Sequence, residues 1–180
     1  MEFLSAITGT TKTLSALATL YKGAVAINSR FIVKKIAAFS EKPFDEKIVQ
    51  DYVNSIDINR WEEIQDAIIH QLTQAESVVK ALYERNLVES LLTHKISDAE
   101  FWKMNFILQH LYTFDVGDLI KLYDGADCSK DQKKIFTFYQ LLNHDNGRTI
   151  EGHTLVLHDD YLLNDFGKKF VESIKGNDIG

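Results

Sequence analysis

NRWEEIQDAIIHQLTQAESVVKAL, residues 59–82, is the stretch that most clearly indicates how this chain folds. Asn59 and Glu62 have the spacing of a capping box, which marks the start of a helix. Apolar residues then return every three or four positions, the period of a single helix face: Trp61, Ile64, Ile68, Leu72, Ala75, Val79 and Leu82. The sequence therefore predicts either one long helix or two helices with a break near Thr73 and Gln74.

The segments on either side of this stretch also favour helices. Pro43 pushes the residue before it out of the helical region, and residues 45–56 then have the pattern of a short amphipathic helix. Ser97 and Glu100 form a second capping-box pattern ahead of another apolar run with helical spacing. With one proline and nine glycines among 180 residues, few helix breakers interrupt the chain. We expect residues 43–112 to form a helical body.

The N-terminal segment differs from this body in charge. No acidic residue lies between Glu2 and Glu41, whereas five basic residues do: Lys12, Lys22, Arg30, Lys34 and Lys35. The segment therefore carries +5, and because the whole chain carries −6, the remaining residues carry −11. We interpret residues 1–42 as a basic arm that binds an anionic surface such as a lipid membrane, or that packs on the acidic body or on a second copy.

The arm is also amphipathic. At about 100° per residue, one broad face collects Leu14, Leu17, Tyr21, Ala24, Val25, Phe31, Ile32, Ile36 and Phe39, and four of the five basic residues lie opposite. Lys35 alone violates the pattern. Charges at Lys22 and Arg30 leave no uncharged run long enough to span a membrane. The residues we expect to bind a partner or a membrane are Leu14, Leu17, Tyr21, Lys22, Arg30, Phe31 and Lys34.

Three roles for the arm remain open at this point. Its apolar face could pack on the body or in an oligomer, it could lie in a membrane interface, or it could be a targeting segment, since it resembles a mitochondrial transit peptide.

Beyond residue 113 the hydrophobic period changes. Residues 116–123 have the pattern of a short helix that ends at Gly125, and residues 130–143 predict another helix, ended by a turn-rich run. Residues 149–163 are rich in alternating and β-branched residues and predict a two-stranded hairpin. A final helix is expected from about Asn164 to residue 175. The predicted fold class is mainly α.

The segment DYLLNDFGKKF, residues 160–170, resembles the Tyr-x-Leu-Thr-x-x-Gly-Lys-x-Phe segment of many bacterial winged-helix domains. In those domains a wing strand turns into a final helix, so the resemblance implies a winged-helix-like fold for residues 113–180. Asn164 stands where the family usually has a capping threonine, and asparagine preserves the N-cap chemistry.

The same resemblance implies DNA binding through a basic recognition helix, for which the candidates are Lys130, Lys133, Lys134 and Arg148. Residues 129–180 hold seven basic and eight acidic residues, whereas a nucleic-acid domain usually has a local excess of positive charge. This balance favours a protein contact or a purely structural role for the region.

A looser resemblance covers residues 72–119, with the helix start KISDAEFW at 95–102 and a later Asp-x-x-x-x-Leu phrase within residues 118–123. This part resembles a broad group of uncharacterised bacterial and mobile-element proteins that have an apolar N-terminal segment, a helical middle and a winged-helix-like tail. The resemblance implies a bacterial or prophage origin and raises a role in conflict between host and phage as a hypothesis.

Catalytic and metal-binding patterns are weak in this sequence. It lacks a phosphate-binding glycine loop, a Gly-x-Ser-x-Gly elbow, a His-Glu-x-x-His helix and a Cys-x-x-Cys pair, so we expect no enzyme and no cofactor. Glu62, Asp66 and His70 share one helix face, but we interpret them as solvated surface. Metal binding by His153 and His158 is also not expected, because their spacing puts them on opposite faces of a strand.

The single cysteine, Cys128, cannot form an internal disulfide, which favours a cytoplasmic protein, with peripheral membrane contact left open. Our leading hypothesis is a non-enzymatic interaction protein, self-associating or partner-binding, whose basic arm docks on a partner or a membrane surface. The rival hypothesis is a dimeric winged-helix regulator that binds DNA.

Overall fold

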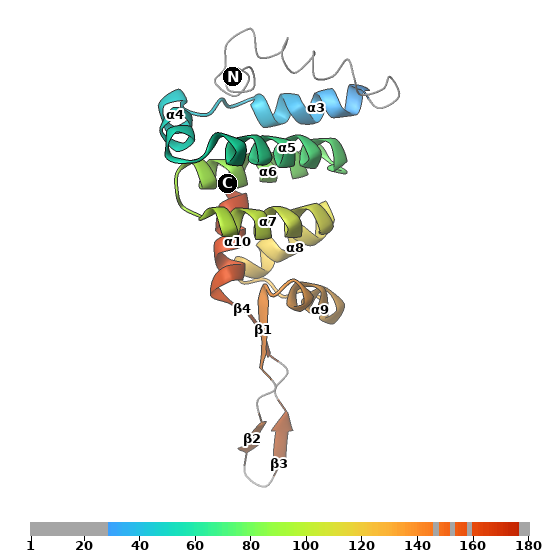
Figure 1. Cartoon of the computed structure of the whole chain (residues 1–180). Coiled ribbons are helices and arrows are strands. Elements are labelled where there is room, and N and C mark those ends of the chain that lie inside the picture. Colours follow the sequence, from blue (N-terminus) through green and yellow to red (C-terminus); the bar gives the residue numbers. More distant parts are fainter. Residues whose placement is uncertain (1–28, 146–147, 152–153, 158–159, 177–180) are drawn as a thin grey trace. The chain divides into compact units, whose positions relative to one another are not determined.

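The computed structural model describes residues 29–145, 148–151, 154–157 and 160–176, and at residues 29, 145, 148–151, 154–157 and 160 it describes the backbone alone. The described chain forms two compact units, which divide after His110 (Figure 1). The predicted boundary between the helical body and the C-terminal region, after residue 112, lies two residues from this division.

The first unit is a bundle of helices in its described part. Its elements are α3 (Ser29–Ser40), α4 (Glu46–Ser55), α5 (Ile58–Gln74), α6 (Val78–Leu92) and α7 (Asp98–His110). Helix α6 lies at the centre and packs against each of the other four. Because it is surrounded, α6 buries residues on all sides and has no consistent polar face, which is why its apolar pattern looked irregular in the sequence.

The sequence placed the apolar residues from Trp61 to Leu82 on one buried helix face, which is correct for the first part of this stretch and wrong for the second. Trp61, Ile64, Ile68, Leu72 and Ala75 are all buried, but Val79 is 46% exposed and Leu82 is only half-buried. The reason is the break between α5 and α6, close to the position the sequence indicated. The chain turns between the two helices, so α6 presents a different set of residues to the core.

Of the two capping boxes that the sequence predicted in this unit, one is present in the structure and one is not. Ser97 and Glu100 form the predicted reciprocal pair, with the Ser97 backbone N–H donating to Glu100 Oε2 at 2.7 Å. For α5 the prediction was wrong, because the N-cap is Asp57, whose carboxylate accepts from the backbone N–H of Asn59. Asp57 competes better because a carboxylate at the N-terminus also interacts favourably with the helix dipole.

The second unit has the helix, helix, ribbon, helix order of a winged helix. It contains α8 (Thr113–Tyr123), α9 (Lys130–Phe138), four short strands and α10 (Asp165–Lys175). The strands are β1 (Leu142–Asp145), β2 (Arg148–Glu151), β3 (Thr154–Leu157) and β4 (Asp160–Leu163). The prediction of a mainly α fold with a small winged-helix-like part is confirmed.

The hairpin is longer than the sequence predicted. Antiparallel β2 and β3 pair Arg148 with Leu157, and antiparallel β1 and β4 pair Leu142 with Leu163. Both ladders keep the same register, so β1 to β4 follow one two-stranded ribbon whose ladders are separated by two residues on each side. The ribbon begins at Leu142, within the residues that the sequence assigned to a helix.

Helix α9 ends five residues before the predicted Asn143 because of a left-handed residue. Gln140 has φ +59°, and its N–H donates to Thr137 O at 2.9 Å while the N–H of Leu141 donates to Phe136 O at 2.9 Å. These are the two hydrogen bonds of a Schellman motif. Glycine or asparagine usually occupies the left-handed position, so a glutamine there gave no stop signal in the sequence.

The resemblance segment at residues 160–170 has a clear structural basis. Asn164 caps α10, because its side-chain oxygen accepts from the backbone N–H of Gly167 at 2.7 Å. A Cβ at Gly167 would lie 2.1 Å from the carbonyl oxygen of Leu141, so only glycine allows this close approach of α10 to the start of the ribbon. The predicted final helix and its asparagine cap are confirmed.

Candidate interaction surface

Lys35 attaches α3 to the rest of the first unit. Its side chain is 1% exposed, and Nζ donates to Thr73 O at 3.0 Å and to Ala75 O at 2.8 Å. These carbonyls lie where α5 ends and have no donor within the helix, so an ammonium there satisfies them and interacts favourably with the helix dipole. Burial lowers the pKa of Lys35, and the nearby Glu76 carboxylate opposes that change.

This contact corrects the interpretation of Lys35 as a break in the apolar face of the arm. The residue belongs to the inner face of α3, where its charge has a specific acceptor site. Phe39 is also buried there, and its ring meets that of Phe44 edge-on at 5.9 Å between centroids. Ile32 and Ile36 are half-buried beside them. The inner face is therefore mostly apolar with one lysine that caps α5.

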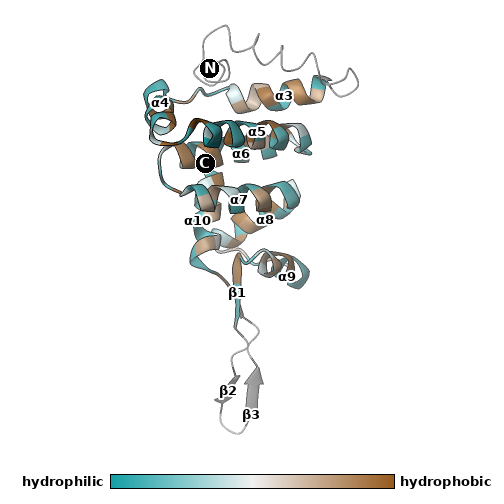
Figure 2. Ribbon diagram, in the orientation of Figure 1, coloured by the Kyte–Doolittle hydropathy of each residue, from teal (hydrophilic) through white to brown (hydrophobic). Residues whose placement is uncertain are grey.

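The opposite side of α3 is exposed and basic. Arg30, Val33, Lys34 and Ala37 are all exposed, and we call these four residues the outer face of α3. Val33 is 53% exposed. Within the part of the chain that the structure describes, no acidic side chain pairs with Arg30 or Lys34. Figure 2 shows the brown, hydrophobic segments of α3 with hydrophilic ones between them.

Phe31 lies at the flank of this outer face and not on the inner face with Phe39. It is 42% exposed, and the Lys35 ammonium lies 5.2 Å from the centroid of its ring. Eight residues of helix separate Phe31 from Phe39, which is a rotation of about 80°. The sequence interpretation placed both on one broad face, and the structure separates them.

The predicted arm residues thus divide into two groups. Arg30, Phe31 and Lys34 lie on α3 and are exposed, as a partner-binding role requires. The remaining four lie outside the described residues: Leu14, Leu17, Tyr21 and Lys22.

The three candidate DNA-contacting lysines all lie on α9. Lys133 Nζ is 2.6 Å from Asp127, and Lys134 Nζ is 2.9 Å from Asp131. Lys130, at the first position of α9, is exposed. The side chain of Arg148, in β2, lies outside the described part of the structure.

Charged residues inside α6 were missed by the sequence analysis. Lys80 is 3% exposed, and its Nζ donates to Glu76 at 2.8 Å and to Gln109 O at 3.1 Å. Arg85 is 5% exposed, and its Nε donates to Lys42 O at 3.0 Å. Charged residues within a helical segment normally indicate an exposed face, so only the packing of four helices around α6 reveals their burial.

Glu84 is the most unusual of these buried groups. It is 0% exposed, and neither carboxylate oxygen has a hydrogen-bond partner among the described residues. Burial raises the pKa of Glu84 to about 8, although the charge of Lys80 acts in the opposite direction. A carboxyl group with this pKa is mainly neutral at pH 7.

The remaining sequence candidates do not assemble into a chemical centre. Within the described ranges, no group of three histidine, cysteine, aspartate or glutamate side chains is arranged to hold a metal ion. Cys128 is half-buried, and burial raises the pKa of its thiol, with Lys133 acting in the opposite direction. No described helix has the length and hydropathy needed to cross a membrane.

Comparison with known proteins found no relative of this chain. No family model, curated protein or solved structure matches the chain.

Proposed function

We propose that this chain is a non-enzymatic interaction protein that self-associates or binds a protein partner through the outer face of α3. The observation that carries the proposal is the two-sided helix itself. Its inner face is attached through Lys35 and Phe39, whereas Arg30 and Lys34 are exposed beside Val33. A helix held in place with an exposed basic and apolar face is suited to docking.

Charge favours a second copy or another acidic protein as the occupant. The chain outside residues 3–40 carries −11, so its acidic surface attracts Arg30 and Lys34 on the outer face of α3 of another copy. An anionic membrane surface is also negatively charged and could bind the same face of α3. The experiment must therefore distinguish a membrane from an acidic protein.

The test combines light scattering of the full chain with flotation on liposomes that contain phosphatidylserine. We expect an assembly larger than one chain, and we expect Val33→Asp to weaken it at least roughly tenfold, because a carboxylate would be desolvated in the contact. Val79→Asp is the matched control, since Val79 is 46% exposed and belongs to α6, not to α3. Equal effects of the two variants would contradict the proposal.

Flotation distinguishes a lipid surface from a protein as the binding partner of the outer face of α3. If the chain floats with anionic liposomes and Lys34→Glu abolishes flotation while the protein stays monomeric, the outer face of α3 contacts lipid. If the chain neither floats nor associates, and a protein partner captured by wild-type chain binds Val33→Asp equally well, the outer face of α3 has no docking role.

DNA binding is the second candidate, supported by the helix and ribbon arrangement of the second unit. A ribbon with continuous register that follows α9 has the place of a wing. Fluorescence anisotropy with duplex DNA tests this candidate, with replacement of Lys130, Lys133 and Lys134 by alanine as the variant. Binding that falls steeply with salt and is lost in this variant would favour DNA, whereas binding that persists in it would argue against α9 as the reading helix.

A further inference from the structure

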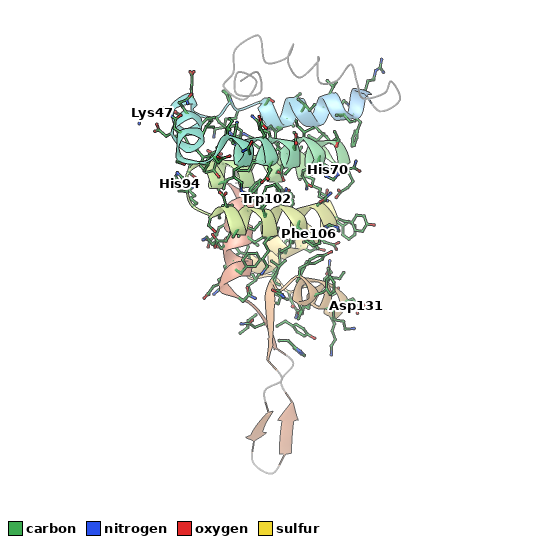
Figure 3. The ribbon with its side chains drawn as sticks, in the orientation of Figure 1. Lys47, His70, His94, Trp102, Phe106 and Asp131 are labelled. Carbon is green, nitrogen blue, oxygen red and sulfur yellow. The ribbon has the colours of Figure 1, made fainter. Side chains whose placement is uncertain are left out.

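Helix α5 carries an exposed charged face whose sign is opposite to that of the outer face of α3. Glu62 and Asp66 are exposed and lie four residues apart on α5, as the sequence analysis expected of a solvated face. Ile58, four residues before Glu62, is 60% exposed. His70, labelled in Figure 3, lies four residues beyond Asp66. Residues four apart are neighbours on a helix surface, and we call Ile58, Glu62 and Asp66 the acidic face of α5.

The two carboxylates of this face are not balanced by a cation. Among the residues that the structure describes, no basic side chain pairs with Glu62 or Asp66. Most other acidic side chains of the first unit cap a helix, pair with a basic side chain or lie buried: Asp45, Asp51, Asp57, Glu63, Glu76, Glu84, Glu89, Asp98 and Glu100. In the described part of this unit, Glu62 and Asp66 are therefore the two neighbouring carboxylates on one helix that another molecule can engage.

The acidic face of α5 matches the outer face of α3 in spacing as well as in charge. Arg30 and Lys34 are also four residues apart, and four residues of helix rise about 6 Å. Like charges at this spacing repel each other and destabilise their helix. The described part of one chain shows no ion pair between the two faces. A contact between α3 of one copy and α5 of another removes the repulsion on both helices.

The apolar residues beside these charges favour an antiparallel contact. When Arg30 lies opposite Asp66 and Lys34 lies opposite Glu62, Ala37 is about 4.5 Å beyond Lys34 and Ile58 is about 6 Å beyond Glu62 in the same direction. The two apolar side chains then lie next to each other. In a parallel contact Ile58 would lie beyond Arg30, where α3 has no described apolar residue to meet it. Ion pairs fix the register of such a contact, and apolar burial stabilises it.

We propose that the acidic face of α5 is the surface of a second copy that binds the outer face of α3. Arg30 pairs with Asp66, Lys34 pairs with Glu62, and Ile58 packs against the exposed side of α3. This inference rests on the proposed docking role of α3 and adds the identity of the surface that α3 contacts.

Charge-swapped variants of the full chain test this contact. Arg30→Glu with Lys34→Glu makes the outer face of α3 acidic, and Glu62→Lys with Asp66→Lys makes the acidic face of α5 basic. Each variant alone brings like charges together, so its self-association, measured by light scattering over a dilution series, should weaken at least roughly tenfold. An equimolar mixture of the two variants restores opposite charges at the contact and should associate about as tightly as wild type.

A matched control separates the acidic face of α5 from the net charge of the chain. Glu41→Lys with Glu46→Lys changes the net charge by the same amount as the α5 variant, at two exposed positions outside α5. This control should associate at least as tightly as wild type. Urea unfolding at concentrations below those of association checks that every variant folds as wild type does.

The possible results separate this inference from the proposed function. If wild type is monomeric, or if the α3 variant self-associates as tightly as wild type, self-association through α3 is wrong and this inference is wrong with it. If the α3 variant loses association while the α5 variant keeps it, the docking role of α3 stands and α5 is not its partner surface. The inference is also overturned if the mixture does not associate, or if the control weakens association as much as the α5 variant does.

Discussion

Replacing Glu84 with glutamine should change how the stability of the first unit depends on pH. Glu84 is fully buried and has no hydrogen-bond partner among the described residues, and burial raises its pKa from 4.5 in the unfolded chain to about 8 in the folded one. Between these two values the folded state holds more protons than the unfolded state. The free energy of unfolding therefore decreases as pH rises through this window.

The size of the effect follows from the two pKa values. A difference of one pH unit between the folded and unfolded pKa values corresponds to about 1.36 kcal/mol of free energy. For a folded pKa of about 8, Glu84 lowers the free energy of unfolding, relative to low pH where its carboxyl group is protonated in both states, by about 1 kcal/mol at pH 5 and about 3 kcal/mol at pH 7. The wild-type chain should lose about 2 to 3 kcal/mol between these pH values through this residue alone. Glu84→Gln has no proton to release and lacks this loss.

Urea unfolding followed by tryptophan fluorescence measures the difference. Both tryptophans, Trp61 and Trp102, lie in the first unit, so their signal reports the unit that contains Glu84. We expect the variant to be close to wild type at pH 5 and more stable at pH 7. Glu62→Gln, at an exposed position on α5, controls for the loss of one charge. If wild type and Glu84→Gln lose stability in parallel as pH rises, the carboxyl group is solvated or paired, and the reasoning is refuted.

Three further predictions concern local contacts. Lys35→Met keeps the apolar stem but leaves Thr73 O and Ala75 O without their donor, so the first unit should lose about 1 to 3 kcal/mol in the same urea assay. Gly167→Ala should destabilise the second unit by about 1 to 3 kcal/mol because of the clash with Leu141 O, although alanine is the better helix former; a stabilised variant, by thermal unfolding followed by circular dichroism, would contradict the close approach. Ser129→Ala removes the capping box of α9 and should cost about 1 kcal/mol in that thermal assay, with Ser55→Ala in the first unit leaving the second unit unchanged.

Most of the fold could be predicted from the sequence because helix signals are local. The capping box at Ser97 and Glu100 and the asparagine cap at Asn164 act within three residues, so they can be recognised without a tertiary structure. The period of the apolar residues from Trp61 to Leu72 reflects one face of one helix. The helix boundaries were wrong at two places. At Gln140 a glutamine takes the left-handed position that usually belongs to glycine or asparagine, and at Asp57 a stronger N-cap residue replaces Asn59.

The candidate surfaces were predicted less completely because they depend on how helices pack. Amphipathic periodicity indicated Arg30 and Lys34 as an exposed basic pair on α3, and the structure places both on the outer face. A groove between α5 and α7 could not be found in this way, since Gln71 and Asn105, which line it, are far apart in the sequence and come together only through the packing of α5 with α7.

The sequence by itself determined the helical class and the basic character of α3, because composition, period and capping residues act over a few neighbours. The winged-helix-like end was expected from the resemblance of residues 160–170 to winged-helix domains. The tertiary structure alone decided which charges are buried. Lys35 and Glu84 have the same side chains as the exposed lysines and glutamates of this chain. Nevertheless, Lys35 caps α5, and Glu84 lies in the core without a hydrogen-bond partner among the described residues. Burial depends on the neighbours that other helices supply, and a charge changes its pKa and its energetic role only when those neighbours exclude water.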